Sequence, residues 1–565
     1  MRQVMAMSQQ HGLSQTLAQL LVVRGVALDE ATTFLSPSLK TLLPDPSHLL
    51  DMDKAVIRLV TAIKGKETIA VWGDYDVDGA TSSALLLRYF RALGIQPLVY
   101  IPDRMKEGYG LNTAGLLGLR EQGATLVISV DSGTLSFEPI EAASNVGLDV
   151  IVVDHHLGDS RRPKACALVN PNRLDESSPH RHLAAVGVAF LLLVALNKKL
   201  REEAFFHGVA EPDLRQWLDI VALGTICDVV PLIGVNRALV TQGLKVMAQR
   251  GNAGMCAVMD IAGLDERPGV YHAGYVIGPR INAGGRVGKS NLGVRLLSTD
   301  DDEEALSLAR ELNHFNAERK AIEASIQEEA DTIADAADAN FPILVVAGKG
   351  WHQGVIGIVA GRLKERFRKP VAVIGIEGGI GKASARSVTG MDLGAAVIAA
   401  KEVGLLLAGG GHAMAAGFTV EEKNIIPLTE FLSSRLMPHA HHLAREHRLP
   451  IDLALSINAA TPETALEIEK IGPFGQGNFP VRVMLQSVVN LRPERVGENH
   501  VKTLFTHRTS NARLAGIAFR CADNPLGQAL LNSRGKEIDV AGQLRLQEWQ
   551  GRPQMSLMVE DVKLY

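Results

Sequence analysis

Between residues 51 and 154 the sequence alternates short apolar runs with longer stretches of helical periodicity. The apolar runs are IAVWG, PLVYIP, LVISVD and VIVVD, and stretches such as SSALLLRYFRALG separate them. This alternation is typical of an α/β fold in which a doubly wound, mostly parallel sheet lies between helices. It restricts the fold strongly, because each short strand must be buried on both faces.

The chain has 565 residues, too many for one hydrophobic core. Residues 301–340 contain neither Gly nor Pro and have helical periodicity, whereas short runs after residue 450 alternate apolar and polar side chains. We predict an N-terminal helical segment (1–50), an α/β domain (51–300), a long connecting helix (301–340), a second, smaller α/β domain (341–440) and an OB-like β domain (450–565).

Composition narrows the possible partners. The formal net charge is −4, so any contact with nucleic acid must come from local basic groups. The most apolar segment, LAAVGVAFLLLVAL at 183–196, is shorter than a membrane span and predicts a buried helix. The N-terminus lacks the order of a signal peptide, and the four cysteines form no CxxC pair. We therefore predict a soluble, cytoplasmic protein without membrane contact.

Acidic and imidazole side chains follow several of the predicted strands. Because the carboxyl ends of parallel strands meet at one edge of a sheet, these side chains should converge there. In GDYDVDG the spacing of two also puts three carboxylates on one side if the segment stays extended. The candidates are Asp74, Asp76 and Asp78 after the first run, Asp131 after LVISV, Asp154, His155 and His156 after VIVV, and Asp228 after an apolar helical run.

Each of these acids alone is readily explained as a turn residue or a helix cap. Together they form a set of oxygen ligands with some imidazole and no thiolate, which suits Mg²⁺ or Mn²⁺ better than Zn²⁺ or copper. Two such ions would offset the repulsion among the carboxylates and would suit in-line phosphoryl chemistry. Asp131 is the natural bridging ligand, and His156 could donate to a phosphate oxygen or protonate the leaving group.

The motifs GDYDVDGATS, VISVDSG, VDHH and TICDVVPL together resemble those of the DHH phosphoesterase family. Farther along, GYVIGPRINAGGRVG, WHQGVIGIVAGRL, SARSVTGMDLG and GGGHAMAAGF resemble the RecJ branch of that family with its DHHA1 domain. The resemblance implies a metal-dependent 5′→3′ exonuclease for single-stranded DNA, acting in DNA repair and recombination. It also implies that Asp76, Asp78, Asp131, His155 and Asp228 are metal ligands, with Asp74 less clearly one, and that Asp154 orients the histidines.

Several residues outside the acidic cluster are candidate contacts to the substrate. Glycine lets the backbone approach a phosphate, and arginine binds phosphate oxygens bidentately. The candidates are Arg280, Asn282 and Arg286 in GPRINAGGR, and Arg386, Ser387 and His412 in the second domain. Each motif alone could instead be structural, with Gly409–Gly411 forming only a tight turn. The segment from residue 481 to residue 520 contains seven Lys/Arg and only two acids, and Phe505 and Phe519 in it could supply stacking rings.

Two other functions share parts of this pattern. Another DHH hydrolase, acting on short oligonucleotides, cyclic dinucleotides or pyrophosphate, would have the same metal site but would not need a C-terminal β domain. A non-enzymatic replication scaffold would keep the fold, but the intact ligand set argues against it. By resemblance alone, single-strand-binding protein and a recombination helicase are possible partners, and we expect a monomer.

Overall fold

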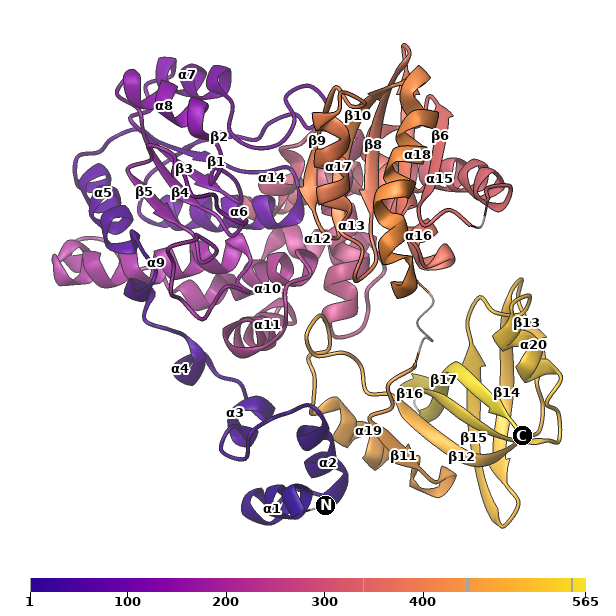
Figure 1. The fold of residues 1–565 in the computed structure, drawn as a ribbon. Helices are drawn as coiled ribbons and strands as arrows, with labels where there is room; N and C mark the ends of the chain where they lie inside the picture. Colours follow the sequence, from indigo (N-terminus) through magenta and orange to yellow (C-terminus); the bar gives the residue numbers. More distant parts are fainter. Residues whose placement is uncertain (1, 339, 444–447, 550–551) are drawn as a thin grey trace. The chain divides into compact units, whose positions relative to one another are not determined.

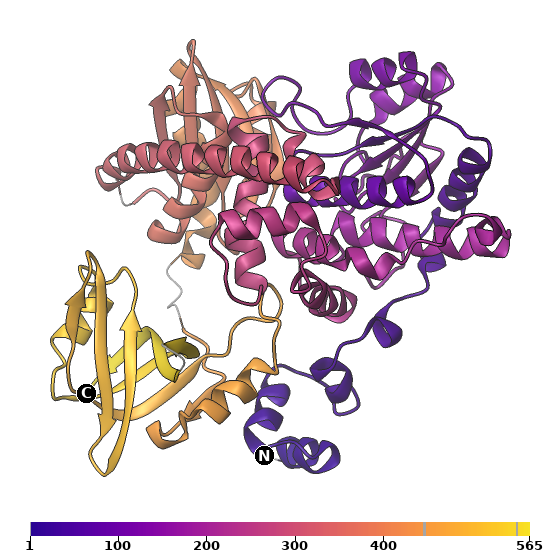
Figure 2. The ribbon, with the colours of Figure 1, turned by 180° about the vertical axis from the view of Figure 1, so that it is seen from behind.

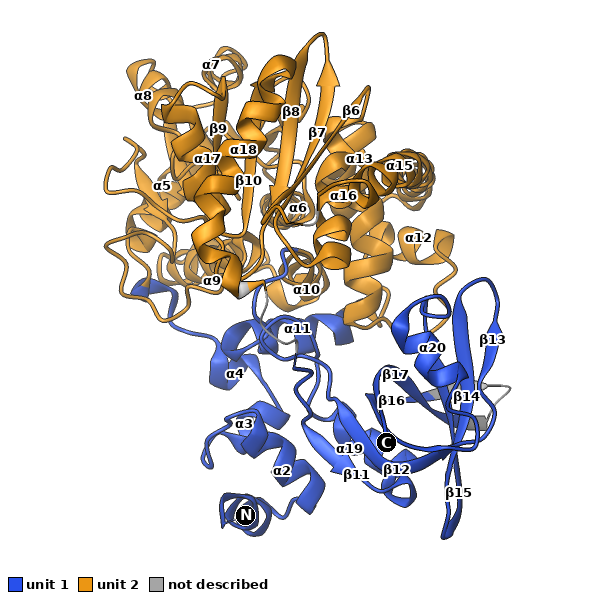
Figure 3. Ribbon diagram, turned by 45° about the vertical axis from the view of Figure 1, so that its right-hand side comes forward, with its two compact units in different colours: residues 1–48, 228–246, 448–565 blue, residues 49–227, 247–447 orange. Residues whose placement is uncertain are grey.

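The computed structural model describes residues 2–338, 340–443, 448–549 and 552–565. These residues form two compact units, which are considered one at a time (Figure 3). The larger unit contains residues 49–227 and 247–447, and the smaller contains residues 1–48, 228–246 and 448–565. Within the described residues, no helix is both long and apolar enough to cross a membrane.

The larger unit begins with the predicted parallel sheet. Its strands lie in the order β2-β1-β3-β4-β5, and every pair of neighbours is parallel (Figure 1). Residues of the central strands are fully buried, which explains why their sequences read as continuous apolar runs. The strands are β1 (Ile69–Trp72), β2 (Leu98–Tyr100), β3 (Leu126–Val130), β4 (Asp149–Val153) and β5 (Ala167–Val169).

Helices enclose this sheet. The apolar segment at 183–196 lies in α9, where most side chains are buried against α5, α6 and α10. The helices are α5 (Met52–Lys64), α6 (Val77–Ala92), α7 (Thr113–Glu121), α8 (Phe137–Asn145), α9 (Ala185–Glu202) and α10 (Leu218–Cys227). The prediction that the apolar segment at 183–196 forms a buried core helix is confirmed by α9.

A helical layer joins this sheet to a second one in the same unit. The predicted long helix is confirmed as α15 (Asp302–Asp335), whose N-terminus is capped by the carboxylate of Asp301. It packs on α12 and α13 and also on α16 and β6, so it spans both parts of the unit (Figure 2). The other helices of the layer are α12 (Ala253–Ile261), the π-helical turn η4 (His272–Ile277), α13 (Gly278–Val287) and α14 (Leu292–Ser298).

The second sheet is mixed, with strand order β6-β7-β8-β10-β9. The glycines of GGGH do not make a tight turn but form most of the edge strand β9, paired antiparallel to β10. The strands are β6 (Leu344–Lys349), β7 (Val371–Glu377), β8 (Ile380–Arg386), β9 (Ala408–His412) and β10 (Ala415–Glu421). They pack with α16 (Gln353–Phe367), α17 (Leu393–Glu402) and α18 (Ile425–Leu436).

The smaller unit is built around a seven-stranded sheet of order β11-β12-β16-β17-β15-β14-β13, in which an additional β12–β14 pairing brings distant strands together as in a barrel. The predicted OB-like domain is therefore confirmed. Its strands are β11 (Leu453–Leu455), β12 (Val483–Asn490), β13 (Glu494–Val496), β14 (His500–His507), β15 (Ser510–Ala518), β16 (Glu537–Trp549) and β17 (Arg552–Leu564).

Short helices complete the smaller unit. The N-terminal helices share one hydrophobic core with the C-terminal domain, because Leu17 and Leu20 pack in the same cluster as Ile468 and Ile471. The buried guanidinium of Arg237 joins these parts by donating to carbonyls of both segments. The helices are α1 (Arg2–His11), α2 (Gln15–Val23), α3 (Ala31–Leu35), α4 (Leu39–Leu42), α11 (Gly234–Met247), α19 (Pro462–Glu469) and α20 (Pro525–Leu531).

Candidate metal centre

The three aspartates of GDYDVDG lie where β1 passes into α6. The premise that this segment stays extended is wrong, because Asp76 is the N-cap of α6 and accepts a hydrogen bond from the backbone N–H of Gly79 at 3.1 Å. Asp78 lies in the first helical turn and accepts from the N–H groups of Ala185 and Val186, at the start of α9, at 2.7 and 2.9 Å. The helix N-termini, rather than strand alternation, therefore orient these carboxylates.

Asp74 is the most informative of the three. It is 2 % exposed, and its Oδ1 has no hydrogen-bond partner among the described residues. Burial, and secondly the charge of Asp76, raise the pKa of Asp74 to about 8. One ligand atom each from Asp74, Asp76 and Asp131 lies within 4.8 Å of the others. A buried carboxylate oxygen without a donor, among other carboxylates, is the arrangement that a bound cation would satisfy.

Asp131 lies at the carboxyl end of β3 and connects two groups of possible ligands. Its φ of 59° places it in the left-handed region, a strained conformation that the neighbouring β4 holds through a hydrogen bond from the Asp131 N–H to the carbonyl of Val153 at 3.0 Å. Asp131 belongs both to the aspartate group and to a second group with His155 and His156. This position suits the bridging role that the sequence predicts.

The histidines that follow β4 differ in environment. His155 Nε2 lies 3.3 Å from Asp131 Oδ1 and 3.8 Å from Asp78 Oδ2. Burial, and secondly repulsion from the imidazolium of His156, lower the pKa of His155 to about 4. Its imidazole is therefore neutral near pH 7, which is the form that binds a metal ion.

Asp154 holds the second histidine. Its Oδ1 lies 2.8 Å from His156 Nδ1, and Oδ1 and Oδ2 accept from the backbone N–H groups of His155 and Thr134. Burial alone would raise the pKa of Asp154, but these bonds and the charge of His156 outweigh it and hold the pKa below its usual range. Burial alone would lower the pKa of His156, because it disfavours the charged imidazole. The hydrogen bond to Asp154 and the charge of Asp154 outweigh burial, so the pKa of His156 is raised. This geometry supports an orienting role for Asp154.

Asp228 directly follows α10, whose last residue is Cys227. One turn earlier in that helix, a Cβ on Gly224 would lie 3.2 Å from Asp78 Oδ1, so α10 approaches Asp78 closely at this point. Asp228 is half-buried and follows Gly224 by four residues, the spacing of side chains on one helix face. Its assignment as a ligand stays a prediction.

These donors suit a hard divalent cation. They are carboxylate oxygens and a neutral imidazole, which Mg²⁺ and Mn²⁺ accept. Burial, and secondly the charge of the neighbouring Asp76, raise the pKa values of Asp74 and Asp78. Bound cations would remove that repulsion, so the residues fit the predicted metals.

Three residues beside the site were not predicted from the sequence. The Tyr109 hydroxyl donates to the Asp131 carbonyl at 2.7 Å and lies 3.1 Å from His156 Nδ1. Asn170 donates from its amide to the His156 carbonyl at 2.8 Å. The Arg104 guanidinium lies 4.9 Å from the centre of the Tyr75 ring. Asn170 directly follows β5, so the rule applied to the acids would have found it, whereas Arg104 and Tyr109 lie farther along the loop after β2.

Two of the predicted substrate-binding arginines lie near Arg104, and one of them, Arg286, also lies near Asp76. Arg286, in α13, donates to the carbonyl of Gly354 in the first turn of α16 at 2.8 Å. Its pKa is lowered to about 10 by burial, and then by the positive charges of residues including Arg104 and Arg386. Burial and Arg104 also lower the pKa of Arg386, at the end of β8. These three residues form an arginine cluster (Arg104, Arg286 and Arg386) whose charges repel one another, as expected of an anion site.

The other predicted contacts differ in their positions. His412 shares a row of the second sheet with Ala415 and Arg386, so its side chain lies on the same face as the Arg386 side chain. Arg280 and Asn282 lie in α13, so GPRINAGGR is helical. The Ser387 hydroxyl is buried and donates to the carbonyl of Met391 at 2.6 Å, so its proton is already used within the second sheet's domain, and its contact with a substrate stays a prediction.

The predicted stacking and basic groups of the C-terminal domain differ in exposure and in ion pairing. Phe505 is fully buried in the barrel core and cannot stack on a base, whereas Phe519 is 52 % exposed. Three of the seven basic residues between 481 and 520 are paired with acids, namely Arg482, Arg495 and Arg508. In the described part of the chain, the other four form no ion pair: Arg492, Lys502, Arg513 and Arg520.

Comparison with known proteins agrees with this geometry. Three family models match: the N-terminal domain of the DHH family at residues 68–225, the DHHA1 domain at 340–437 and the RecJ OB domain at 451–561. The single-stranded-DNA-specific exonuclease RecJ of Escherichia coli is 35 % identical over 563 residues, covering 97 % of this chain and 96 % of the relative.

Crystal structures of RecJ from Thermus thermophilus are also similar. The structure in complex with Mn²⁺ has a TM-score of 0.81 and 28 % identity, covering 100 % of this chain and 78 % of that one. The structure in complex with Mg²⁺ has a TM-score of 0.76 and 27 % identity, covering 100 % and 76 %. Identity over almost the whole length, matching domain models and a shared fold lead to one conclusion: the chain belongs to the RecJ family of single-stranded-DNA-specific exonucleases.

Proposed function

We propose that this protein is a metal-dependent, single-strand-specific 5′→3′ exodeoxyribonuclease that acts in DNA repair and recombination. The observation that carries the proposal is the position of Asp131. It belongs at once to a group of aspartates and to a group with His155 and His156, as a residue shared by two adjacent cations would. Membership of the RecJ family supports the substrate, and the Mn²⁺ and Mg²⁺ complexes of the Thermus protein support the metals.

The proposed ligands are Asp74, Asp76, Asp78, Asp131, His155 and Asp228. Two bound Mg²⁺ or Mn²⁺ ions would supply the positive charge that polarises the scissile phosphate and activates water. The residues themselves hold and orient the reacting groups. Asp154 and Tyr109 fix the ring of His156, which can then donate a proton to a phosphate oxygen or to the leaving 3′-oxygen.

The arginine cluster supports 5′→3′ polarity. It lies close enough to the acids for opposite charges to act across the site: the charge of Arg104 partly offsets the raised pKa of Asp74, and the charge of Asp76 partly offsets the lowered pKa of Arg286. A terminal 5′-phosphate held there by Arg104, Arg286 and Arg386, with His412 on the same sheet face, would place the first phosphodiester bond near the aspartates. The exposed end of the strand would thereby set the direction of digestion.

Digestion of end-labelled strands tests the function directly. We expect Mn²⁺-dependent release of mononucleotides from a 5′-labelled single strand at once, while a 3′-labelled strand shortens gradually. A blunt duplex of the same sequence should be degraded much more slowly. Immediate release of label from the 3′ end, equal rates on duplex and single strand, or hydrolysis without a divalent cation would each contradict the proposal.

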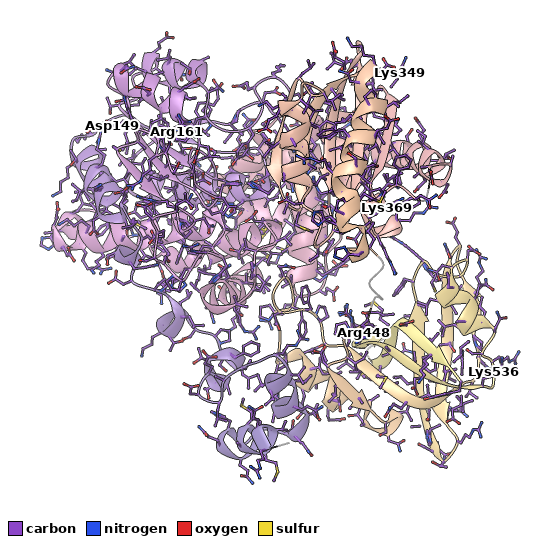
Figure 4. The ribbon with its side chains drawn as sticks, in the orientation of Figure 1. Asp149, Arg161, Lys349, Lys369, Arg448 and Lys536 are labelled. Carbon is purple, nitrogen blue, oxygen red and sulfur yellow. The ribbon has the colours of Figure 1, made fainter. Side chains whose placement is uncertain are left out.

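Removing one arginine tests recognition of the 5′ end. Charge-assisted, bidentate contacts to phosphate are worth about 1.5–3 kcal/mol, so Arg386→Ala should weaken binding of a 5′-phosphorylated strand about 10–100-fold. Binding of the same strand with a 5′-hydroxyl should change little, and fluorescence anisotropy measures both. The control is Lys349→Ala, which removes an exposed charge at the outer end of β6 (Figure 4). Equal losses on both strands would contradict 5′-phosphate binding.

The alternative function, hydrolysis of dinucleotides or pyrophosphate, would need the metal site but not the barrel domain at residues 451–561. An exonuclease that binds DNA through this domain should instead prefer a long single strand. We therefore expect a higher kcat/KM for a long single strand than for a dinucleotide. We further propose a cytoplasmic monomer that works with single-strand-binding protein and a recombination helicase, on the basis of the family alone.

A further inference from the structure

Two tyrosines of the larger unit form an exposed stacked pair. The ring centres of Tyr271 and Tyr275 lie 5.4 Å apart with 24° between the ring planes. The two residues are 65 % and 73 % exposed, and neither hydroxyl forms a hydrogen bond within the described ranges. Large aromatic side chains that remain in water, already aligned face to face, offer a flat apolar surface of the kind that marks binding sites.

The inner face of the same turn is fixed by packing. Tyr275 lies within the π-helical turn η4 and Tyr271 directly precedes it, while Ala273 and Ile277 of that turn are buried. This face lies against the end of α10, since Cys227 Sγ contacts the carbonyl of Ala273 at 3.5 Å. π-helical turns are rare and are frequent at functional sites.

The loop before η4 fixes His272, which in turn contacts the Tyr271 ring. His272 Nε2 lies 3.0 Å from a carboxylate oxygen of Glu266, and Nδ1 accepts from the N–H of Gly269 at 3.0 Å. The His272 ring meets the Tyr271 ring edge-on, with centres 5.7 Å apart. The Tyr271 ring therefore rests against a fixed neighbour before any ligand binds, which lowers the entropic cost of binding.

Positive charge continues from the tyrosines toward the metal centre. Arg280 follows in α13 and donates to Asn313 and to the carbonyl of Val276, both uncharged, so these partners leave its charge available to an anion. At the other end of α13, Arg286 belongs to the arginine cluster. Residues 271–286 thus run from two exposed rings, past a cation, to the proposed 5′-phosphate site.

We propose that Tyr271 and Tyr275 form a stacking platform for bases of the single-stranded substrate, a few nucleotides from its 5′ end. The proposal rests on the proposed exonuclease function and adds a determinant of strand selection. Stacking of bases on aromatic rings is sequence-tolerant because every base has a flat face. Bases in a duplex are already stacked on each other, so the platform favours a single strand.

The position of the platform can be bounded. Tyr275 precedes Arg286 by 11 residues, a separation of roughly 16 Å along a helix. At about 3.4 Å per nucleotide, as in one strand of a duplex, this corresponds to roughly five nucleotides, and to fewer in a stretched strand. We therefore expect the stacked bases near positions three to five from the 5′ end.

Abasic substitution tests the platform. Binding of a 5′-phosphorylated 12-nucleotide strand is measured by fluorescence anisotropy in EDTA, with single abasic sites moved along the strand. The double variant Tyr271→Ala/Tyr275→Ala should bind the intact strand about 10-fold or more weakly. In the wild type, one or two abasic positions should cause a similar loss, and in the alanine variant the same positions should cause almost none. The matched control, Tyr271→Phe/Tyr275→Phe, keeps both rings and should bind within about threefold of the wild type.

Equal abasic penalties in wild type and alanine variant would overturn the platform, as would an equal loss of binding in the phenylalanine control. Both residues are exposed, so thermal unfolding should show that the variants fold normally. The two proposals fail differently. A wild type that neither binds nor digests single strands would refute the proposed function, whereas a wild type that does both, with penalties unchanged in the alanine variant, would refute the platform alone.

Discussion

An Asp131→Asn variant should hydrolyse single-stranded DNA at least roughly 10³-fold more slowly than the wild type, the scale of loss when a central catalytic group is removed. Asparagine preserves the shape of the side chain and tolerates the left-handed backbone that Asp131 adopts. The change therefore removes charge from the residue shared by both ligand groups without disturbing β3. Affinity for a single strand, measured by anisotropy in EDTA, should change by less than about threefold, because the proposed DNA contacts are elsewhere.

The control for this variant removes an acid from the opposite end of the same sheet. Asp149 begins β4, pairs with Arg58 at 2.6 Å and is labelled in Figure 4. Asp149→Ala should keep nearly full activity, since a partly exposed ion pair contributes little to stability. Hydrolysis by Asp131→Asn at more than a tenth of the wild-type rate would show that Asp131 is not the shared ligand. Loss of strand binding by the same variant would place DNA contacts at the metal centre itself.

The sheet and its acidic edge could be predicted from the sequence because both follow from local pattern. Buried parallel strands read as continuous apolar runs, and residues directly after them reach one edge whatever their loops do. Asp74, Asp131 and His155 were found in this way. Arg104 and Tyr109 obey the same rule but lie several residues beyond β2, where loop geometry, which is not periodic, decides whether a side chain returns to the site.

Other expectations failed where tertiary packing outweighs local preference. GPRINAGGR contains residues that disfavour helices, yet it forms α13. A Cβ on Gly285 would lie 2.6 Å from the carbonyl oxygen of Tyr75, so this glycine serves the close approach of α13 to the segment after β1. Phe505 could not be distinguished from Phe519 by composition, because the difference is one of position: Phe505 lies in β14 with its ring in the barrel core, whereas Phe519 follows β15 and is exposed.

Stability without metal should depend on pH in the opposite way to stability with metal. Burial raises the pKa of Asp74 to about 8 and that of Asp78 to about 7. Below these pKa values the two carboxyls are protonated in the folded, metal-free protein, whereas in the unfolded chain they are ionised above about pH 4. The folded state therefore binds more protons, so its stability falls as pH rises toward pH 8. Between pH 6.5 and 8 the free energy of unfolding should fall by about 1–2 kcal/mol, since one proton contributes about 1.4 kcal/mol per pH unit.

Differential scanning calorimetry with EDTA or with saturating Mn²⁺ measures this reversal. In EDTA the midpoint of thermal unfolding should decrease by a few degrees from pH 6.5 to 8. With Mn²⁺ it should rise over the same range, because ligands must be ionised to bind the cation. Asp74→Asn should flatten the EDTA curve, raise the midpoint at pH 8 and reduce the gain from Mn²⁺. A midpoint in EDTA that rises with pH, or an Asp74→Asn curve parallel to the wild type, would remove Asp74 from the metal centre. Agreement would mean that the repulsion among these aspartates destabilises the empty site and that binding of the ions reverses the effect.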